Sequence, residues 1–192
     1  MAIGVLVFPG VEELDFVGPW EMFTMWSSYA DGPSAIVTVA ETPGPLTCAK
    51  GLGIIADKGL DGDYDIVLVP GGYAVFDLID NQAILNFLKR HSERGAHILS
   101  VCTGAFFLQK AGLLEGKEAT THWKAMDQLA ALPGVKAVKQ RYMNAGNIWT
   151  AAGVSAGIDM ALAFIAHIAG KEAAATVQKN AEYYPEHVDY SA

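Results

Sequence analysis

One cysteine stands where a predicted buried strand turns into a predicted helix, and this junction constrains the fold more than any other segment. Residues 96–101 form a short apolar run of strand type, and residues 105–111 read as the start of a helix that stops at Gly112. Cys102 and Gly104 lie in the tight turn between them, in the pattern Ser-x-Cys-x-Gly. This is the cysteine version of the nucleophile elbow, Gly-x-Ser-x-Gly, so a sheet with a thiol at its carboxyl edge is expected.

A thiol in such a turn lies beside a helix N-terminus, where partial positive charge and unpaired N–H groups favour the thiolate. We therefore expect the pKa of Cys102 to be lowered and the thiol to be functional. The alternative is a buried cysteine that serves only as a small hydrophobic side chain. The strand–Cys–Gly–helix context favours the functional interpretation. The other cysteine, Cys48, lies near a predicted hairpin and is expected to be structural.

Strand-like and helix-like segments alternate along most of the chain, which favours a mainly parallel sheet with helices on both faces. The predicted strands are residues 3–8, 35–40, 46–48, 53–56, 65–69, 96–101, 118–121, 135–144 and 147–151. One helix is predicted to start at Gly18-Pro19. Further helices are predicted over 81–94, 105–111, 123–131, 155–169 and 172–182, and an irregular tail follows from Pro185. No repeat, linker or low-complexity segment divides the chain, so a single α/β domain over residues 1–192 is expected.

Composition excludes several classes of protein. The formal net charge is −8 and no run of Lys or Arg occurs, so a nucleic-acid-binding surface is not expected. No segment approaches the roughly 20 apolar residues that cross a membrane. The two cysteines are far apart and form neither a disulfide framework nor a zinc pattern, which fits a reducing, cytoplasmic setting. The apolar run at the N-terminus is short and has no basic residues before it, so we interpret it as a strand and not a signal peptide.

In open parallel sheets, ligands bind at the carboxyl ends of the strands. The exits after Phe8, Val69 and Val101 are therefore expected to be neighbours around one site. Asp15 follows the first exit between two apolar residues, where partial burial would raise its pKa and let it hold or pass a proton. It could equally cap the next helix, and the sequence leaves these two interpretations open. No metal site is predicted.

The other acidic residues near the first exit are given plainer roles. Glu12 and Glu13 are expected to be solvated. Glu21 lies in the first turn or so of the helix predicted from Pro19, where interaction with the helix dipole explains it better than a buried role in the site.

Backbone and hydroxyl groups near the second and third exits are candidates for binding the reacting group. The N–H groups of the Gly71-Gly72 pair, together with those of Thr103 and Gly104, could form an oxyanion hole, or the glycines could form an ordinary turn. The Thr103 hydroxyl could bond a substrate atom or a water, or cap the helix. His122 could pair with Cys102, but a histidine bonded to a backbone group is favoured.

Taken together, these motifs resemble the ThiJ/PfpI family within the class I glutamine-amidotransferase-like superfamily, from Ile3 to about Glu182. The resemblance implies a flavodoxin-like three-layer sandwich with the cysteine nucleophile elbow. The markers are Phe8-Pro9-Gly10 with Asp15, Gly18-Pro19-x-Glu21, Val69-Pro70-Gly71-Gly72, Cys102-Thr103-Gly104-Ala105, Ala119-Thr120-Thr121-His122-Trp123 and Ala152-Gly153-x-Ser155-Ala156-Gly157-Ile158-Asp159.

Within the family, the sequence looks most like the isonitrile hydratases and the sensor domains of AraC-type regulators. Protease-like and glyoxalase-like members carry histidine after the cysteine, or glutamate where Asp15 stands. The resemblance implies that Cys102, Asp15 and Thr103 are the catalytic residues of a lyase that hydrates an isonitrile to an N-substituted formamide through a thioimidate. Gly72, Gly104, Tyr73 and His122 are the expected oxyanion and substrate-binding residues.

The resemblance carries further expectations. The reaction needs no cofactor or metal, its partner is a small-molecule substrate, and the protein forms a homodimer. The large apolar residues of the helix from Pro19 also favour a dimer, because they span more than one helical face; they are Trp20, Met22, Phe23, Met25 and Trp26. The alternative function is a non-catalytic redox or ligand sensor, like the regulators' sensor domain without their DNA-binding part. The candidate pocket side chains are Trp20, Tyr73, Phe76 and Trp123.

Overall fold

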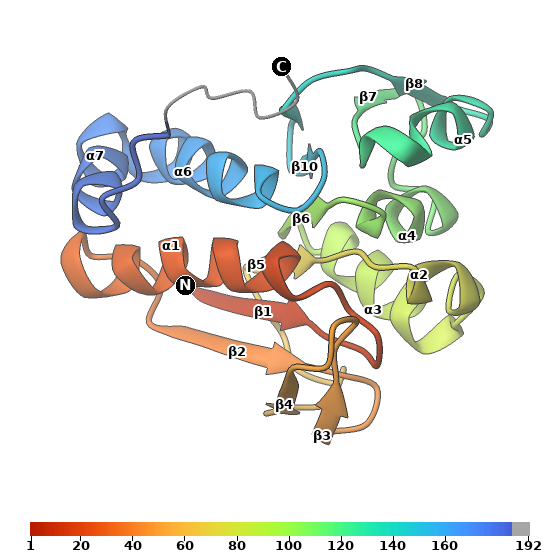
Figure 1. Ribbon diagram of the computed structural model, residues 1–192, viewed down its shortest axis with the longest axis horizontal. Coiled ribbons are helices and arrows are strands. Elements are labelled where there is room, and N and C mark those ends of the chain that lie inside the picture. The colour runs from red at the N-terminus through yellow and green to blue at the C-terminus, as the bar shows by residue number, and fades with distance from the viewer. Residues whose placement is uncertain (186–192) are drawn as a thin grey trace.

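The computed structural model describes residues 1–185 and shows a six-stranded central sheet with helices on both faces (Figure 1). The strand order is β2-β1-β5-β6-β10-β9, and only the β9–β10 pair is antiparallel. The strands are β1 (Ala2–Leu6), β2 (Ala35–Val39), β5 (Ile66–Val69), β6 (His97–Val101), β9 (Tyr142–Ala145) and β10 (Ile148–Ala151). The central strands are continuous apolar runs because both of their faces are covered. The predicted flavodoxin-like α/β fold is confirmed.

Two groups of helices cover the sheet. One group, whose members pack against one another, is α1 (Glu13–Tyr29), α6 (Ala156–Ala169) and α7 (Lys171–Asn180). The other is α2 (Ala74–Asp77), α3 (Gln82–Glu93) and α4 (Gly104–Lys110). On β6 the His97 ring contacts Phe164 of α6, with ring centroids 5.2 Å apart. Because side chains alternate along a strand, Ile98 and Ser100 face the second group. Strands β1, β5 and β6 are adjacent, which confirms that the three predicted exits meet at one edge.

Two small sheets flank the central one. Strands β3 (Gly44–Thr47) and β4 (Gly53–Ala56) form the predicted hairpin. Strands β7 (Lys117–Ala119) and β8 (Val135–Ala137) pair in parallel around a 3-10 turn (Trp123–Ala125) and helix α5 (Met126–Ala130). The prediction of one strand over 135–144 is therefore wrong. The exposed polar residues 139–141 interrupt it, and only β9 continues into the antiparallel hairpin with β10.

Helix α1 starts earlier than predicted. It begins at Glu13 and carries Pro19 inside it, whereas the sequence predicted a start at Gly18-Pro19. Proline removes the backbone bond to the carbonyl four residues earlier, which here is that of Asp15. The helix continues because its apolar face is buried; Phe23, for example, packs on Phe164 of α6 with ring centroids 6.3 Å apart. Asp15 consequently lies within the first turn of a helix and not in a connection.

The large apolar residues of α1 are used within the chain. Met22, Phe23 and Trp26 are buried, while Trp20 and Met25 are partly buried against the same core. They therefore lend no support to a dimer, contrary to the prediction. The exposed apolar side chains of this helix include Leu14 and Val17, each 39% exposed.

None of the helices within residues 1–185 is both long and apolar enough to span a membrane. The tail predicted to be irregular from Pro185 lies, beyond that residue, outside the part of the chain that the structure describes.

Candidate functional site

The junction between β6 and α4 has the geometry of a nucleophile elbow. Cys102 has φ 58°, a left-handed conformation that is uncommon outside glycine and asparagine. Its side chain is 7% exposed. Gly104 must be glycine, because a Cβ there would lie 2.2 Å from the Val69 carbonyl oxygen. The backbone of the elbow thus packs directly on the end of β5, and the predicted elbow is confirmed.

Asp15 is a fully buried carboxyl beside the elbow. Its exposed fraction is 0%, and its Oδ2 accepts a hydrogen bond of 2.8 Å from the Gly71 N–H. Gly71 permits this approach, since a Cβ would lie 2.5 Å from Thr103 Oγ1 and 3.0 Å from Asp15 Oδ2. The residue that caps α1 is Glu12, and its side chain makes no capping bond. The interpretation of Asp15 as a helix cap is therefore wrong.

Thr103 ties the elbow to the Gly71-Gly72 turn. Its hydroxyl donates to the Gly72 carbonyl and accepts from the Gly72 N–H, both at 2.9 Å. Because Gly71 donates to Asp15, neither glycine offers its N–H to a substrate. The prediction of an oxyanion hole from these two N–H groups is thus wrong. The Thr103 hydroxyl is likewise occupied as both donor and acceptor, and it does not cap α4.

Two other backbone N–H groups act on the thiol. Those of Thr103 and Val154, together with the Thr103 side chain, lower the pKa of Cys102. Val154 has φ 49°, which is a strained conformation for a β-branched residue. These two N–H groups, from the residue that precedes α4 and from the loop before α6, are placed to stabilise negative charge on the sulfur. Gly104 begins α4, and a donor role for its N–H stays a prediction.

Asp15 and Cys102 control each other's protonation. Burial raises the pKa of Asp15 to about 7, with a further upward contribution from the Glu12 charge, while the Gly71 hydrogen bond and the neighbouring Cys102 side chain act to lower it. Burial, and then the Asp15 charge, raise the pKa of Cys102 to about 12. The prediction of a lowered thiol pKa is wrong, because loss of solvent outweighs the N–H donors of the elbow. Near neutral pH the site holds a thiol beside a carboxyl that can accept its proton.

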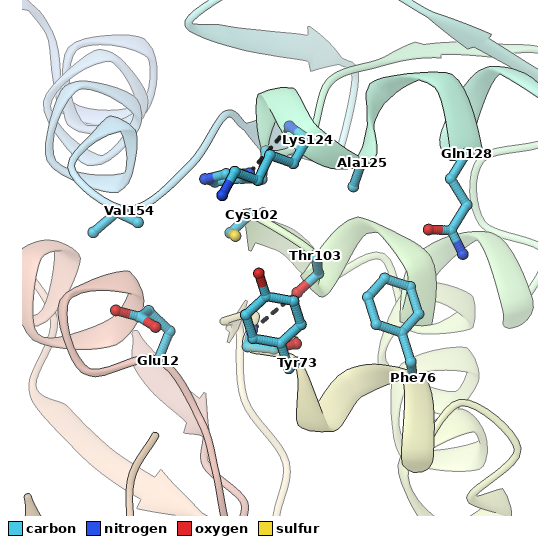
Figure 2. Close-up of a pocket in the computed structure, with 11 residues that line it drawn as sticks. Glu12, Tyr73, Phe76, Cys102, Thr103, Lys124, Ala125, Gln128 and Val154 are labelled. Carbon is cyan, nitrogen blue, oxygen red and sulfur yellow. Dashed lines mark hydrogen bonds between the residues drawn. The ribbon is translucent and has the colours of Figure 1, made fainter. Parts of the chain in front are cut away.

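A cavity of about 200 Å³ opens above the thiol (Figure 2). Figure 2 shows Glu12 and Val154 on one side, Phe76 and Gln128 on the other, and the Cys102 sulfur and Thr103 between them. The lining residues are Glu12, Gly72, Tyr73, Phe76, Cys102, Thr103, His122, Lys124, Ala125, Gln128 and Val154. Asp15 is absent from this lining.

His122 lines the cavity but is bonded to backbone. Its Nδ1 accepts a hydrogen bond of 3.2 Å from the Lys124 N–H, and its ring packs on Gly153, where a Cβ would lie 2.2 Å from Cδ2. Burial, and then the Lys124 charge, lower its pKa. His122 is therefore a neutral imidazole with its proton on Nε2, which supports the backbone-bonded interpretation over a Cys–His pair.

The remaining candidate residues differ in whether they line the cavity. Tyr73, 82% exposed, stands at the cavity rim and Phe76 in its wall, whereas Trp20 and Trp123 do not line it. Glu21 is exposed and has no part in the site, but the predicted interaction with the helix dipole is wrong, because α1 begins at Glu13 and Glu21 lies beyond its first turn. Cys48 is buried in the hairpin region, and burial followed by the Glu13 charge raises its pKa.

Sequence reasoning missed the place of Glu12. It was expected to be solvated, but its side chain is 18% exposed, lines the cavity and forms an ion pair with Lys50. Glu13 is held by the same hairpin, because its Oε1 accepts from the Lys50 N–H at 2.7 Å. No local signal in the sequence could show that the β3–β4 hairpin folds back over these residues. Among residues 1–185, no group of three or more His, Cys, Asp or Glu side chains is arranged to hold a metal ion.

Comparison with known proteins shows which family the chain belongs to. The profile of the DJ-1/PfpI family matches residues 1–167. The isonitrile hydratase of Pseudomonas putida is 36% identical over 188 residues, covering 96% of this chain and 79% of that protein. The Parkinson disease protein 7 homolog of Danio rerio is 30% identical over 182 residues, covering 91% and 93%. The crystal structure of a ThiJ/PfpI family protein from Pseudomonas syringae superposes with a TM-score of 0.89 and 32% identity, covering 98% of this chain and 77% of that one.

Proposed function

The chain belongs to the DJ-1/PfpI family, and we propose that it is an isonitrile hydratase-like enzyme with Cys102 as nucleophile. The observation that carries the proposal is the buried pair of Asp15 and Cys102 beneath a largely apolar cavity. An isonitrile is an uncharged molecule whose terminal carbon must receive both a nucleophile and a proton. The pair supplies both from adjacent side chains.

The first half of the reaction joins the isonitrile to the thiol. Asp15 as carboxylate takes the Cys102 proton while sulfur attacks the terminal carbon, and the protonated carboxyl then gives that proton to the same carbon. The product is a thioimidate, R–N=CH–S–Cys102, with Asp15 again ionised. A carboxyl with a pKa of about 7 suits both roles near neutral pH. The N–H groups of Thr103 and Val154 stabilise the sulfur as it loses its proton.

The second half adds water. Water attacks the thioimidate carbon, one of its protons goes to nitrogen, and collapse of the adduct expels the sulfur. The other proton of the water returns to Cys102 as the thiol re-forms. The released product is the formamide R–NH–CHO, so one isonitrile and one water are consumed for each formamide.

The protonation state of Cys102 argues for this chemistry over peroxide sensing. Redox-sensing cysteines are accessible thiolates of low pKa. Cys102 is 7% exposed and its pKa is raised to about 12, so it needs a base at the moment of reaction. Asp15 supplies that base for an attack on a bound substrate.

The proposal is tested by steady-state turnover. Wild type and Cys102→Ala are each mixed with phenyl isonitrile, and the formyl proton of the product is followed by NMR. We expect formamide from the wild type and none above background from Cys102→Ala. Tight isonitrile binding without turnover by the wild type would instead identify a ligand-binding member of the family.

The homodimer stays a separate proposal that rests on the family resemblance. Sedimentation at micromolar protein concentration tests it, and a species near the monomer mass of 20.4 kDa would contradict it.

A further inference from the structure

We infer that Glu12 is the general base that activates water in the second half of the reaction. The inference rests on the proposed function, because it assigns a residue to one step of that reaction. It starts from the observation that two different residues supply the carboxyl groups of the site. Asp15 supplies the carboxyl beside the thiol, and Glu12 supplies the carboxyl that faces the cavity.

Asp15 is badly placed for water activation. It is 0% exposed, does not line the cavity, and has one carboxyl oxygen, Oδ2, bonded to the Gly71 N–H. When Cys102 carries the thioimidate, the substituent fills the space above sulfur. Water must then approach the thioimidate carbon from the cavity side, away from Asp15. A general base has to reach the proton it abstracts, directly or through one water.

Four other polar groups of the cavity wall either are engaged by other partners or are not bases at neutral pH. The Thr103 hydroxyl donates to and accepts from Gly72. His122 uses the Nδ1 lone pair to accept from the Lys124 N–H, which leaves its proton on Nε2. The Lys124 ammonium lies over the Trp123 ring and has no lone pair to offer. Gln128 carries an amide, which is not a base at neutral pH.

Glu12 carries the one carboxylate on the cavity wall within residues 1–185. Its backbone is fixed, because its N–H donates to the Gly71 carbonyl at 2.9 Å. Lys50 bonds one carboxylate oxygen, Oε1, and a carboxylate has about four acceptor sites, so the pairing leaves capacity for a water. With its side chain 18% exposed, the group meets both solvent and the cavity.

The step balances with this assignment. Glu12 takes a proton from water as the oxygen bonds to the thioimidate carbon, and gives that proton to the nitrogen. It then takes the hydroxyl proton as the carbonyl forms and the C–S bond breaks. The departing sulfur of Cys102 receives that proton back, directly or by way of Asp15. Two carboxylates therefore divide the reaction: Asp15 serves bond formation to sulfur, and Glu12 serves its hydrolysis.

The experiment separates the two halves on Glu12→Gln. The protein is mixed with phenyl isonitrile and quenched in acid at increasing times, and its intact mass is measured by mass spectrometry. We expect the adduct to form in the first turnover at close to the wild-type rate and then to accumulate. Steady-state turnover should fall about 10²–10⁴-fold, as is typical for loss of a general base. Glu13→Gln is the matched control and should turn over like wild type, since Glu13 holds the hairpin and does not line the cavity.

A second variant guards against indirect effects. In Glu12→Ala, added formate should restore hydrolysis of the accumulated adduct in a concentration-dependent way. Glu12→Gln that turns over like wild type, or that loses activity without accumulating adduct, would overturn the inference while leaving the proposed function intact. A wild type that forms no formamide would overturn both.

Discussion

The two cysteines of this protein are both buried, yet they stand in unlike surroundings. Cys102 is 7% exposed and Cys48 is 4% exposed, and burial raises the pKa of each thiol. Cys102 sits at φ 58° beneath a cavity, with two N–H donors and the buried carboxyl of Asp15 beside it. Cys48 lies next to the β3–β4 hairpin, and the carboxylate that raises its pKa, Glu13, is engaged by the hairpin backbone.

The comparison shows that a thiolate at rest is not what distinguishes the functional cysteine. Both thiols are protonated near neutral pH, so reactivity must come from access and from a partner that can take the proton during attack. Cys102 has both and Cys48 has neither. The chemistry of the elbow therefore belongs to the Cys102–Asp15 pair and not to the cysteine alone.

Asp15→Asn should produce the largest contrast. The amide keeps the Gly71 hydrogen bond but cannot take the thiol proton, so isonitrile turnover should fall about 10²–10⁴-fold. Measuring kcat/KM against pH gives a second check. In the wild type it should rise with pH through about 7, where Asp15 ionises, and in Asp15→Asn that rise should vanish. Turnover within a few-fold of wild type would show that Cys102 does not need Asp15.

The stability of the same variant should move in the opposite direction. The pKa of Asp15 is raised from its ordinary 3.8 to about 7, so the folded state holds this proton more tightly than the unfolded chain. The wild type should therefore lose stability as pH rises from about 4 to about 7, by up to about 4 kcal/mol. Asp15→Asn should lack this loss and be more stable than wild type at pH 8, with the gap closing toward pH 4. Urea unfolding at several pH values measures it; a less stable variant at pH 8 would contradict the assignment.

A smaller contrast is expected from alkylation of the two thiols. Iodoacetamide at neutral pH should modify Cys102 before Cys48, because Cys102 lines the cavity, and peptide mass spectrometry can follow both. At pH 9, Asp15→Asn should speed modification of Cys102, since removal of the carboxylate charge lowers the pKa of that thiol. Equal or faster modification of Cys48 in the wild type would remove the distinction drawn between the two cysteines.

Much of the fold could be predicted because its signals are local. The buried runs of β1, β5 and β6, the alternation of strands and helices, and the Ser-x-Cys-x-Gly turn are legible in the sequence. The start of α1 could not be predicted, because proline is typical of the first turn of a helix. The helix continues past Pro19 because it packs on α6.

The sequence indicated which residues form the site, but not their pKa values or the hydrogen bonds that occupy their backbone groups. Cys102, Asp15 and Thr103 do come together, as the motifs indicated. The raised pKa of Cys102, the occupied N–H groups of Gly71 and Gly72, and the place of Glu12 all depend on what the folded chain buries or folds back. Such long-range contacts leave no periodic or spaced pattern in a single sequence.

The most direct test of the account is to find the intermediate. Wild type is mixed with phenyl isonitrile carrying ¹³C at the terminal carbon, quenched in acid within the first turnover, digested and mapped by mass spectrometry. The account predicts one labelled adduct, on the peptide that contains Cys102, which disappears as labelled formamide forms and never builds up in Asp15→Asn. Formamide produced with no adduct on Cys102, or with the label on Cys48, would contradict it.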